Sequence, residues 1–256
     1  MSEQNSSEPV LRASGIDKRF GGLLAVDNVD FDMHAREIHA VIGPNGAGKS
    51  TFLSAIAGDL PPTAGRVFFA GQDVTHLPVD RRTRLGIGRT YQRSAVIAGF
   101  SVLDMVRLAT LHRARSPLRM LSPLGANATA TKAAREALSR VGLEDRAELP
   151  TDFLSHGEKR RLEIAAVLAL DPRILLLDEP LAGLGPDESS DVVALIEGLK
   201  SHCAIMLIEH DIDAVFSVAD RITVLDNGRA IASGTPEAVR NMPAVQHAYL
   251  GFGEDE

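Results

Sequence analysis

The sequence predicts an α/β fold in which a mostly parallel sheet carries an antiparallel β subdomain near the N-terminus and an inserted α-helical subdomain. Three short apolar runs, at 38–42, 174–177 and 204–208, have the composition of buried parallel strands. Apolar and acidic residues alternate over 29–33, which is typical of a half-exposed antiparallel strand. Between 100 and 150 the apolar residues instead recur with the period of amphipathic helices.

The first apolar run ends in the segment 43–51, which fits the pattern G-x-x-x-x-G-K-[ST]. Its residues are Gly43, Pro44, Asn45, Gly46, Ala47, Gly48, Lys49, Ser50 and Thr51. Glycines let the backbone turn several N–H groups into one hollow, and a helix opening at Ser50 adds its free N–H groups and its positive dipole end. Lys49 supplies a cation for the outer phosphates, and Ser50 a hydroxyl suited to Mg²⁺. The segment is therefore interpreted as a nucleotide phosphate loop rather than as a Gly-rich structural turn.

The other two apolar runs also end in polar residues, Asp178-Glu179 and Glu209-His210. Because ligands bind at the carboxyl ends of strands in open α/β sheets, these groups are expected near the phosphate loop. Phosphoryl transfer needs a metal ligand and a group that orients water, roles for which Asp178 and Glu179 are the candidates. The alternative, two acids at a solvated strand end, is disfavoured by the neighbouring phosphate loop.

Two amphipathic helices are expected near 102–109 and 130–141, with a Pro- and Gly-containing loop at 116–125 between them. Near the C-terminus, the Asn-Gly pair at 227–228 predicts a β-hairpin.

The predicted organisation has three parts. Residues 1–92 hold the antiparallel strands and the first part of the nucleotide-binding core, and 93–170 hold the helical subdomain. Residues 171–256 hold the second part of the core, the hairpin and the C-terminal helices.

Composition excludes several classes of protein. The formal charge of −7 opposes nucleic-acid binding, which requires a net basic surface. The single cysteine, Cys203, rules out an internal disulfide and a cysteine-based zinc site. The longest apolar run, 164–170, has seven residues, whereas a membrane span needs about 20.

The segment Leu154-Ser155-His156-Gly157-Glu158 carries a capping box and, taken alone, predicts only a well-capped helix that runs to about residue 170. It resembles the LSGGQ signature of the ATP-binding-cassette ATPases, and it stands shortly before the strand–Asp–Glu segment as in that family. The resemblance covers nearly the whole chain. It implies a P-loop NTPase (RecA-like) core that binds ATP and Mg²⁺. It also implies that Ser155, Gly157 and Glu158 meet ATP held by a second subunit.

The resemblance assigns further residues. Phe20 matches an aromatic that stacks on adenine, and Gln92 matches a glutamine that approaches the metal and the attacking water. His210 matches a histidine that touches the γ-phosphate, and 181–185 matches the loop that contacts the other cassette. The implied catalytic residues are Glu179, His210, Gln92 and Lys49. The implied metal ligands are Ser50, Gln92 and Asp178.

Four segments, at 89–92, 160–165, 207–211 and the C-terminal tail, look like ATPase subunits of branched-chain amino acid importers. Importers for urea, amides and aromatic acids share much of this pattern, so the solute stays open. The implied partners are a second cassette (this chain or a paralogue), two membrane permease subunits and, indirectly, an extracytoplasmic solute-binding protein. The implied location is peripheral, on the cytoplasmic face of the bacterial inner membrane.

Some residues depart from the family pattern. His156 stands where glycine is usual, Glu158 where glutamine is commoner, and Gly185 replaces the usual aspartate of the dimer-contact loop.

Two other functions share some of these motifs. DNA-repair and chromosome-organising cassettes place long coiled coils between the two motifs, whereas Lys49 and Ser155 stand only 106 positions apart here. A non-catalytic cassette is disfavoured by the intact set of candidate catalytic residues. Five arginines form a basic stretch that is interpreted either as a face for membrane subunits or as a solvated face; they are Arg81, Arg82, Arg84, Arg89 and Arg93.

Overall fold

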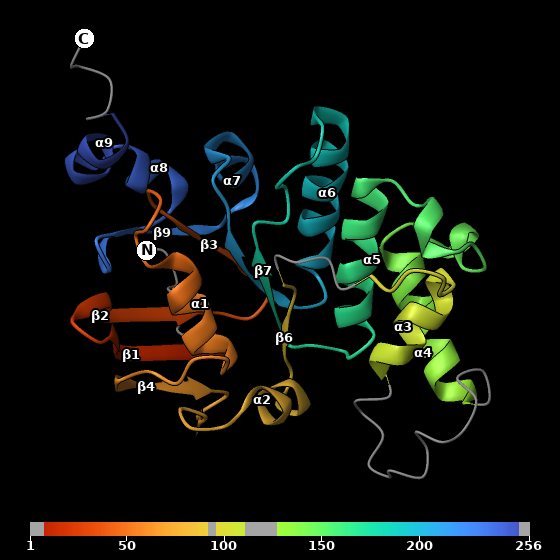
Figure 1. Cartoon of the computed structure of the whole chain (residues 1–256). Helices are drawn as coiled ribbons and strands as arrows, with labels where there is room; N and C mark the ends of the chain where they lie inside the picture. The colour runs from red at the N-terminus through yellow and green to blue at the C-terminus, as the bar shows by residue number, and fades with distance from the viewer. Residues whose placement is uncertain (1–7, 92–95, 111–126, 251–256) are drawn as a thin grey trace, which may run out of the picture.

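The structure is a computed structural model that describes residues 8–91, 96–110 and 127–250 (Figure 1). Its main sheet has six strands in the order β10-β9-β3-β8-β7-β6. Their bounds are Ile38–Ile42 for β3, Ile87–Arg89 for β6, Ile174–Asp178 for β7, Ala204–Ile208 for β8, Arg221–Asp226 for β9 and Arg229–Gly234 for β10. All neighbouring pairs are parallel except β9 with β10.

The three apolar runs form the adjacent central strands β3, β8 and β7, and every residue in them is buried. Successive side chains point to opposite faces, so Leu175 and Leu177 join one apolar cluster while Ile174 and Leu176 join the other. Burial on both faces explains why these strands read as continuous hydrophobic runs. The predicted parallel core is confirmed.

A second sheet is antiparallel, in the order β2-β1-β4-β5, as the sequence predicts. Its strands are β1 (Leu11–Phe20), β2 (Leu23–Met33), β4 (Ala64–Phe69) and β5 (Gln72–Asp73). Helix α1 (Lys49–Ala57) packs against it, with the ring centroids of Phe31 and Phe52 5.6 Å apart (Figure 1). Residues of α1, the antiparallel sheet and one face of the main sheet belong to a single buried cluster. The helix that follows the phosphate loop is therefore held between the two sheets.

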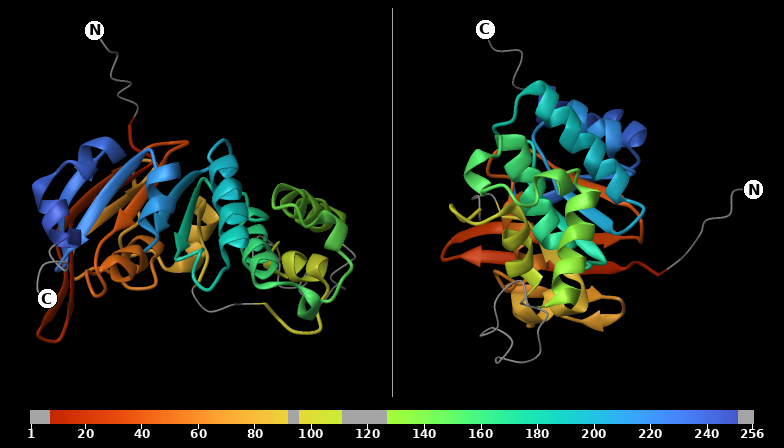
Figure 2. Two further views of the ribbon diagram at one scale, coloured as in Figure 1. Left: turned by 90° about the horizontal axis from the view of Figure 1, so that it is seen from above. Right: turned by 90° about the vertical axis from the view of Figure 1, so that its right-hand side faces the viewer.

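Helices α3 (Val102–Thr110), α4 (Ala128–Arg140) and α5 (His156–Leu168) pack together at one end of the molecule, beyond edge strand β6 (Figure 2). They confirm the two amphipathic helices and the capped helix, while the expected loop at 116–125 lies outside the described residues. The remaining helices are α2 (Val79–Leu85), α6 (Pro186–Leu199), α7 (Ile212–Val218), α8 (Pro236–Arg240) and α9 (Pro243–Leu250). No helix in the described ranges is long and apolar enough to cross a bilayer.

The basic stretch is not uniformly solvated, because the guanidinium of Arg82 on α2 is 1 % exposed. Its Nη1 donates to the carbonyls of Ala55 and Ile56 in the last turn of α1, 2.8 and 2.5 Å away. Its Nη2 donates to Thr75 O at 2.8 Å, and its Nε to Leu77 O at 3.0 Å. Arg82 thus caps a helix C-terminus, whose carbonyls lack intrahelical partners and attract a cation.

Candidate functional site

The phosphate loop leaves β3 and enters α1 through two glycines that pack tightly on one side. Gly43 has φ +154° and Gly48 has φ +96°. A Cβ on Gly43 would lie 2.0 Å from Leu225 O, and one on Gly48 would lie 2.3 Å from Ala25 O. At Gly46, by contrast, a Cβ would meet nothing within 4 Å. The loop is therefore pressed against β2 and β9 on one side and open at Gly46, where a ligand has room to approach.

The β9–β10 hairpin packs against the phosphate loop. Its predicted Asn227-Gly228 turn is confirmed, with φ of +46° and +82°. The Gly228 N–H donates to Ala47 O at 3.1 Å, and Gly228 O accepts from Asp27 N at 2.8 Å. Backbone bonds thus tie the phosphate loop to the hairpin turn, and the turn to β2.

Lys49 reaches into the curl of the loop. Its Nζ donates to Gly43 O at 2.7 Å and to Pro44 O at 2.9 Å, and the residue is 5 % exposed. Burial lowers the pKa of Lys49, although the nearby carboxylates of Asp178 and Glu179 favour the charged form. The loop consequently holds a preoriented cation beside its open face.

The predicted metal ligands Ser50 and Asp178 face each other across the ends of β3 and β7. Ser50 Oγ lies 3.4 Å from Asp178 Oδ1. Mg²⁺ binds oxygen ligands at about 2.1 Å in octahedral geometry, which places neighbouring ligand atoms about 3 Å apart. This oxygen pair fits a magnesium ion, which Ser50 and Asp178 would hold. No cluster of three or more His, Cys, Asp or Glu side chains suited to a metal occurs in the described part of the chain.

Arg89 is a site residue to which the sequence analysis gave no chemical role. Its Nη2 donates to Asp178 Oδ2 at 3.0 Å, and its Nη1 binds Ser54 Oγ and the carboxylate of Asp59. The side chain is 10 % exposed, so Arg89 is not part of a solvated face. Arg89 is the last residue of β6 and pairs with Leu176 of β7, whereas the sequence placed it only in the basic stretch and in the importer-like segment 89–92.

Glu179 and His210 meet at the ends of the neighbouring strands β7 and β8. His210 Nε2 lies 2.7 Å from Glu179 Oε1. The Glu179 N–H donates to Ile208 O at 2.9 Å, and Glu179 itself has φ +50°, a conformation that costs a non-glycine residue about 1 kcal/mol or more. The strained backbone turns this carboxylate out of the strand and toward His210.

The signature segment begins α5 as predicted. Ser155 is the N-cap, and its hydroxyl accepts from Glu158 N while the Glu158 carboxylate accepts from Ser155 N. Unexpectedly, Glu188 of α6 also binds this corner. Glu188 Oε1 accepts from Ser155 Oγ at 2.9 Å and from Gly157 N at 3.0 Å, and these two bonds lower the Glu188 pKa. A carboxylate therefore sits on donors that are suited to an anion.

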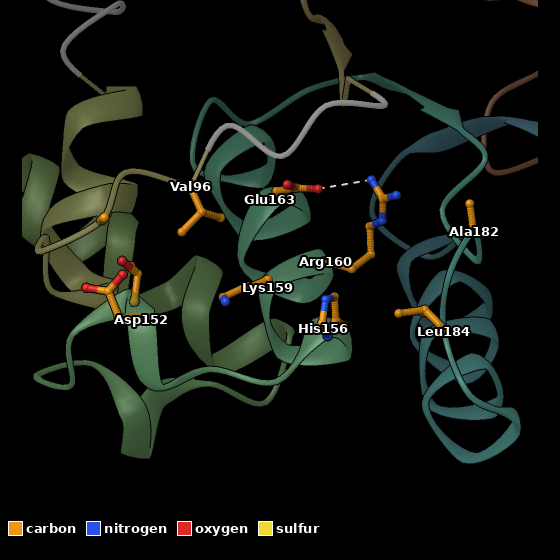
Figure 3. A pocket seen from close by; sticks show the side chains of 10 residues that line it. Val96, Asp152, His156, Lys159, Arg160, Glu163, Ala182 and Leu184 are labelled. Carbon is orange, nitrogen blue, oxygen red and sulfur yellow. Dashed lines mark hydrogen bonds and ion pairs between the residues drawn. The ribbon is translucent and has the colours of Figure 1, made fainter.

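A cavity of about 330 Å³ lies beside this corner, between α5, the loop that follows β7 and residues 96–98. Figure 3 shows His156 on the α5 side of the cavity, opposite Leu184, and the ion pair between Arg160 and Glu163 further along α5. Arg160 Nη2 also donates to Glu179 O at 3.3 Å, which links α5 to the candidate base.

The structure brings together Lys49, Ser50, Asp178, Glu179 and His210. No hydrogen bond or ion pair among residues 8–91, 96–110 and 127–250 joins the 155–158 corner to the phosphate loop.

Two further candidates stand apart from that group. Phe20, at the end of β1, is 46 % exposed, with Lys18 Nζ 5.4 Å from its ring centroid. Gln92 lies outside the described residues.

This fold, with a phosphate loop, a strand–Asp–Glu end and a capped signature helix, defines an ATP-binding cassette. The family model described as ABC transporter matches residues 26–182, and the chain belongs to this family. Cassettes of this family bind ATP or ADP and are ATPases coupled to transport. A second model, described as branched-chain amino acid ATP-binding cassette transporter, matches residues 231–251.

Among named relatives, the chain is 39 % identical to the high-affinity branched-chain amino acid transport ATP-binding protein LivG of Escherichia coli (strain K12), over 96 % of this chain and 99 % of that protein. It is 38 % identical to the corresponding protein BraF of Pseudomonas aeruginosa, with the same two coverages. The chain is thus homologous to ATP-binding subunits of this class of transporter.

Solved structures agree. The ADP conformation of an ATP-binding cassette of an ABC transporter superposes with a TM-score of 0.87 at 29 % identity, over 96 % of this chain and all of the other. A dimeric cassette in a post-hydrolysis state with ADP and Pi gives a TM-score of 0.74 at 25 % identity, over 88 % of this chain and 98 % of the other. Homologous cassettes work as dimers with membrane permease components, within membrane transporter complexes.

Proposed function

We propose that this chain is the Mg²⁺-dependent ATPase subunit of an importer for branched-chain or other hydrophobic amino acids. The observation that carries the catalytic part is the convergence of five side chains at the carboxyl edge of β3, β7 and β8. They are Lys49, Ser50, Asp178, Glu179 and His210. The proposed solute class, amino acids, rests on the LivG and BraF relatives and on the match at 231–251. These favour it over urea, amides and aromatic acids.

The geometry supports one proposed role for each side chain. Lys49 and the loop amides bind the outer phosphates, and Ser50 and Asp178 hold the metal. When bound, Mg²⁺ neutralises charge on the phosphate oxygens. Glu179 orients the attacking water, while His210, fixed by its 2.7 Å contact with Glu179, reaches the γ-phosphate. Charge spreads over the phosphoryl oxygens in the transition state, so preoriented cations and N–H groups supply most of the stabilisation.

A second cassette completes the site. In this proposal Ser155, Gly157 and Glu158 meet ATP that is bound by another subunit, either this chain or a paralogue, and Phe20 stacks on adenine. Because Glu188 occupies Ser155 and Gly157 in the single chain, dimer closure has to exchange that carboxylate for phosphate oxygens.

The membrane permease subunits are proposed to bind at a groove between the core and the helical end. A cavity of about 410 Å³ lies there, lined by residues of α2, β6, α3 and α5, and Tyr91 stands at it next to Gln92 in sequence. A permease segment in this groove would touch both parts that move relative to each other in a cassette cycle. An extracytoplasmic solute-binding protein acts indirectly, and the chain is placed on the cytoplasmic face of the bacterial inner membrane.

ATP turnover tests the catalytic proposal. Glu179→Gln should bind ATP with parental affinity yet lose almost all hydrolysis, whereas Lys49→Ala should lose affinity as well. The matched control is Glu197→Gln, an exposed carboxylate on α6 for which turnover stays unchanged. Parental hydrolysis by Glu179→Gln would show that the base is misassigned.

Uptake tests the solute. Cells that lack this chain should lose uptake of radiolabelled leucine, and the parental gene should restore it while the Glu179→Gln gene does not. Restored uptake of urea or an aromatic acid instead of leucine would assign the other importer class.

A further inference from the structure

Glu209 is a buried carboxylate to which the proposed mechanism gives no role. It follows β8 directly, lies between Ile208 and His210, and is 4 % exposed. A buried charged residue is costly unless its oxygens are hydrogen-bonded, so its partners indicate what it does.

Both carboxylate oxygens of Glu209 bind backbone N–H groups of the two loops that carry the candidate catalytic pair. Oε1 accepts from Leu181 N at 2.6 Å, in the loop that follows Glu179. Oε2 accepts from His210 N at 3.0 Å. Burial raises the pKa of Glu209, while these backbone donors act in the opposite direction and favour its ionised form.

Three cross-links consequently join the ends of β7 and β8. The Glu179 N–H donates to Ile208 O, the Leu181 N–H donates to Glu209, and the Glu179 carboxylate contacts His210. The middle link is the only one of the three made by a side chain to backbone. Without it, the hydrogen bonds that the described residues form between this loop and the β8 end would all be at Glu179 itself.

The loop after Glu179 has few internal restraints of its own. Its Ala182 N–H bonds to Glu179 O at 3.2 Å and its Leu184 N–H to Leu181 O at 3.2 Å, while Gly183 has φ +78°. Gly185 supplies no side chain where the family usually has aspartate. The hydrogen bond from Leu181 N to Glu209 therefore restrains the loop that links Glu179 to the expected dimer contact.

We propose that Glu209 is a positioning residue. It holds the 181–185 loop, which the resemblance assigns to dimer contact, at a fixed position relative to His210. It thereby couples this loop to Glu179 and His210. The proposal rests on the proposed ATPase function. A displacement of about 1 Å at reacting groups can cost about 100-fold in rate, so loss of this link should lower kcat rather than ATP binding.

The test compares Glu209→Ala and Glu209→Gln with Glu37→Gln in the transporter complex. Glu37 is a matched control, since it is also a buried carboxylate (7 % exposed) that accepts from a backbone N–H, that of His34 at 2.9 Å, but it lies before β3 at the opposite end of that strand. We expect Glu209→Ala to lower kcat about 10- to 100-fold with little change in KM for ATP. Glu209→Gln, which keeps one acceptor oxygen, should recover part of this loss. Glu37→Gln should lower the melting temperature but leave kcat unchanged.

Two readouts separate positioning from simple destabilisation. Amide hydrogen exchange at Leu181 should become faster in Glu209→Ala and stay parental in Glu37→Gln. In a His210→Ala background, Glu209→Ala should add little further loss of kcat, because residues that act through one another are not additive. Equal kcat losses in the Glu209 and Glu37 variants, unchanged exchange at Leu181, or full additivity would overturn the proposal. The proposed ATPase activity, by contrast, fails if the parental complex does not hydrolyse ATP.

Discussion

The buried guanidinium of Arg82 offers the sharpest test of how the phosphate-loop helix is held. Burial lowers the pKa of Arg82 to about 10, so the side chain is still cationic at neutral pH. No carboxylate forms an ion pair with it among the described residues; four carbonyl oxygens surround it instead. Replacement by lysine keeps the charge and tests whether the planar arrangement of guanidinium N–H donors is required.

The expected loss follows from a count of partners. The lysine ammonium is a single compact donor group, so it reaches about two of the four carbonyls and leaves the other two unpaired. Each buried carbonyl that loses its partner costs about 1–3 kcal/mol, so two unpaired carbonyls should destabilise the fold by about 2–6 kcal/mol in Arg82→Lys. For a chain of this size, 1 kcal/mol corresponds to about 2–4 °C, which predicts a fall in melting temperature of about 4–24 °C.

Thermal unfolding followed by fluorescence or circular dichroism measures this shift. Arg84→Lys is the matched control on the same helix, because Arg84 is half exposed and pairs with Asp80 at 3.5 Å. That exposed pair should change stability by no more than about 0.5 kcal/mol. If Arg82→Lys melted within 2 °C of the parent, as the control is expected to, the argument from the four carbonyls would be wrong.

Three other residues give direct tests. Burial raises the pKa of Cys203 to about 11, so at pH 8 its thiol should react with a disulfide reagent roughly 100-fold more slowly in the native than in the denatured chain; equal rates would contradict its burial. Gly48→Ala should abolish ATP binding and lower the melting temperature, because its Cβ would lie 2.3 Å from Ala25 O; a parental binding curve would exclude this close approach. Glu188→Ala frees the Ser155 hydroxyl, so ATP-driven dimers seen by size exclusion should form at lower ATP concentrations, and a need for more ATP would show that Glu188 supports the corner instead.

The sequence was most informative where local chemistry decides structure. Burial on both sheet faces requires continuous apolar runs, so β3, β7 and β8 could be located within one residue of their bounds. The phosphate loop, the Asn-Gly hairpin and the capping box of α5 each depend on residues within a few positions of one another. Their backbone geometry is fixed by those residues, so a pattern alone predicted them.

Contacts between distant segments escaped the same reasoning. Arg82 binds carbonyls 26 and 27 positions away, and Arg89 binds Asp178 across 89 positions. A run of arginines indicates a charged surface when composition is the only information, because guanidinium groups are rarely buried without partners. Here the partners come from α1 and β7, and only the folded chain brings them to α2 and β6.

Glu188 and Glu209 show why the site is more than its motif residues. The sequence marked Glu209 only as a polar residue at a strand end and gave Glu188 no role, yet each accepts hydrogen bonds from the backbone of a catalytic or signature loop. Backbone N–H groups have no sequence signature, so their side-chain acceptors could not be foreseen.

The same contacts bear on how ATP binding is driven. Lys49 already donates to two loop carbonyls, and the donors of the signature corner already bind the Glu188 carboxylate. At these groups ATP, bound as proposed, would exchange existing partners, and an exchanged hydrogen bond contributes little net free energy. The protein alone does not supply a polyanion that would bind the phosphate loop of one cassette and the 155–158 corner of another at once. Joining two sites through one ligand makes the second contact effectively intramolecular, so closure of two cassettes should depend on the triphosphate spanning them and reverse when hydrolysis cuts that link.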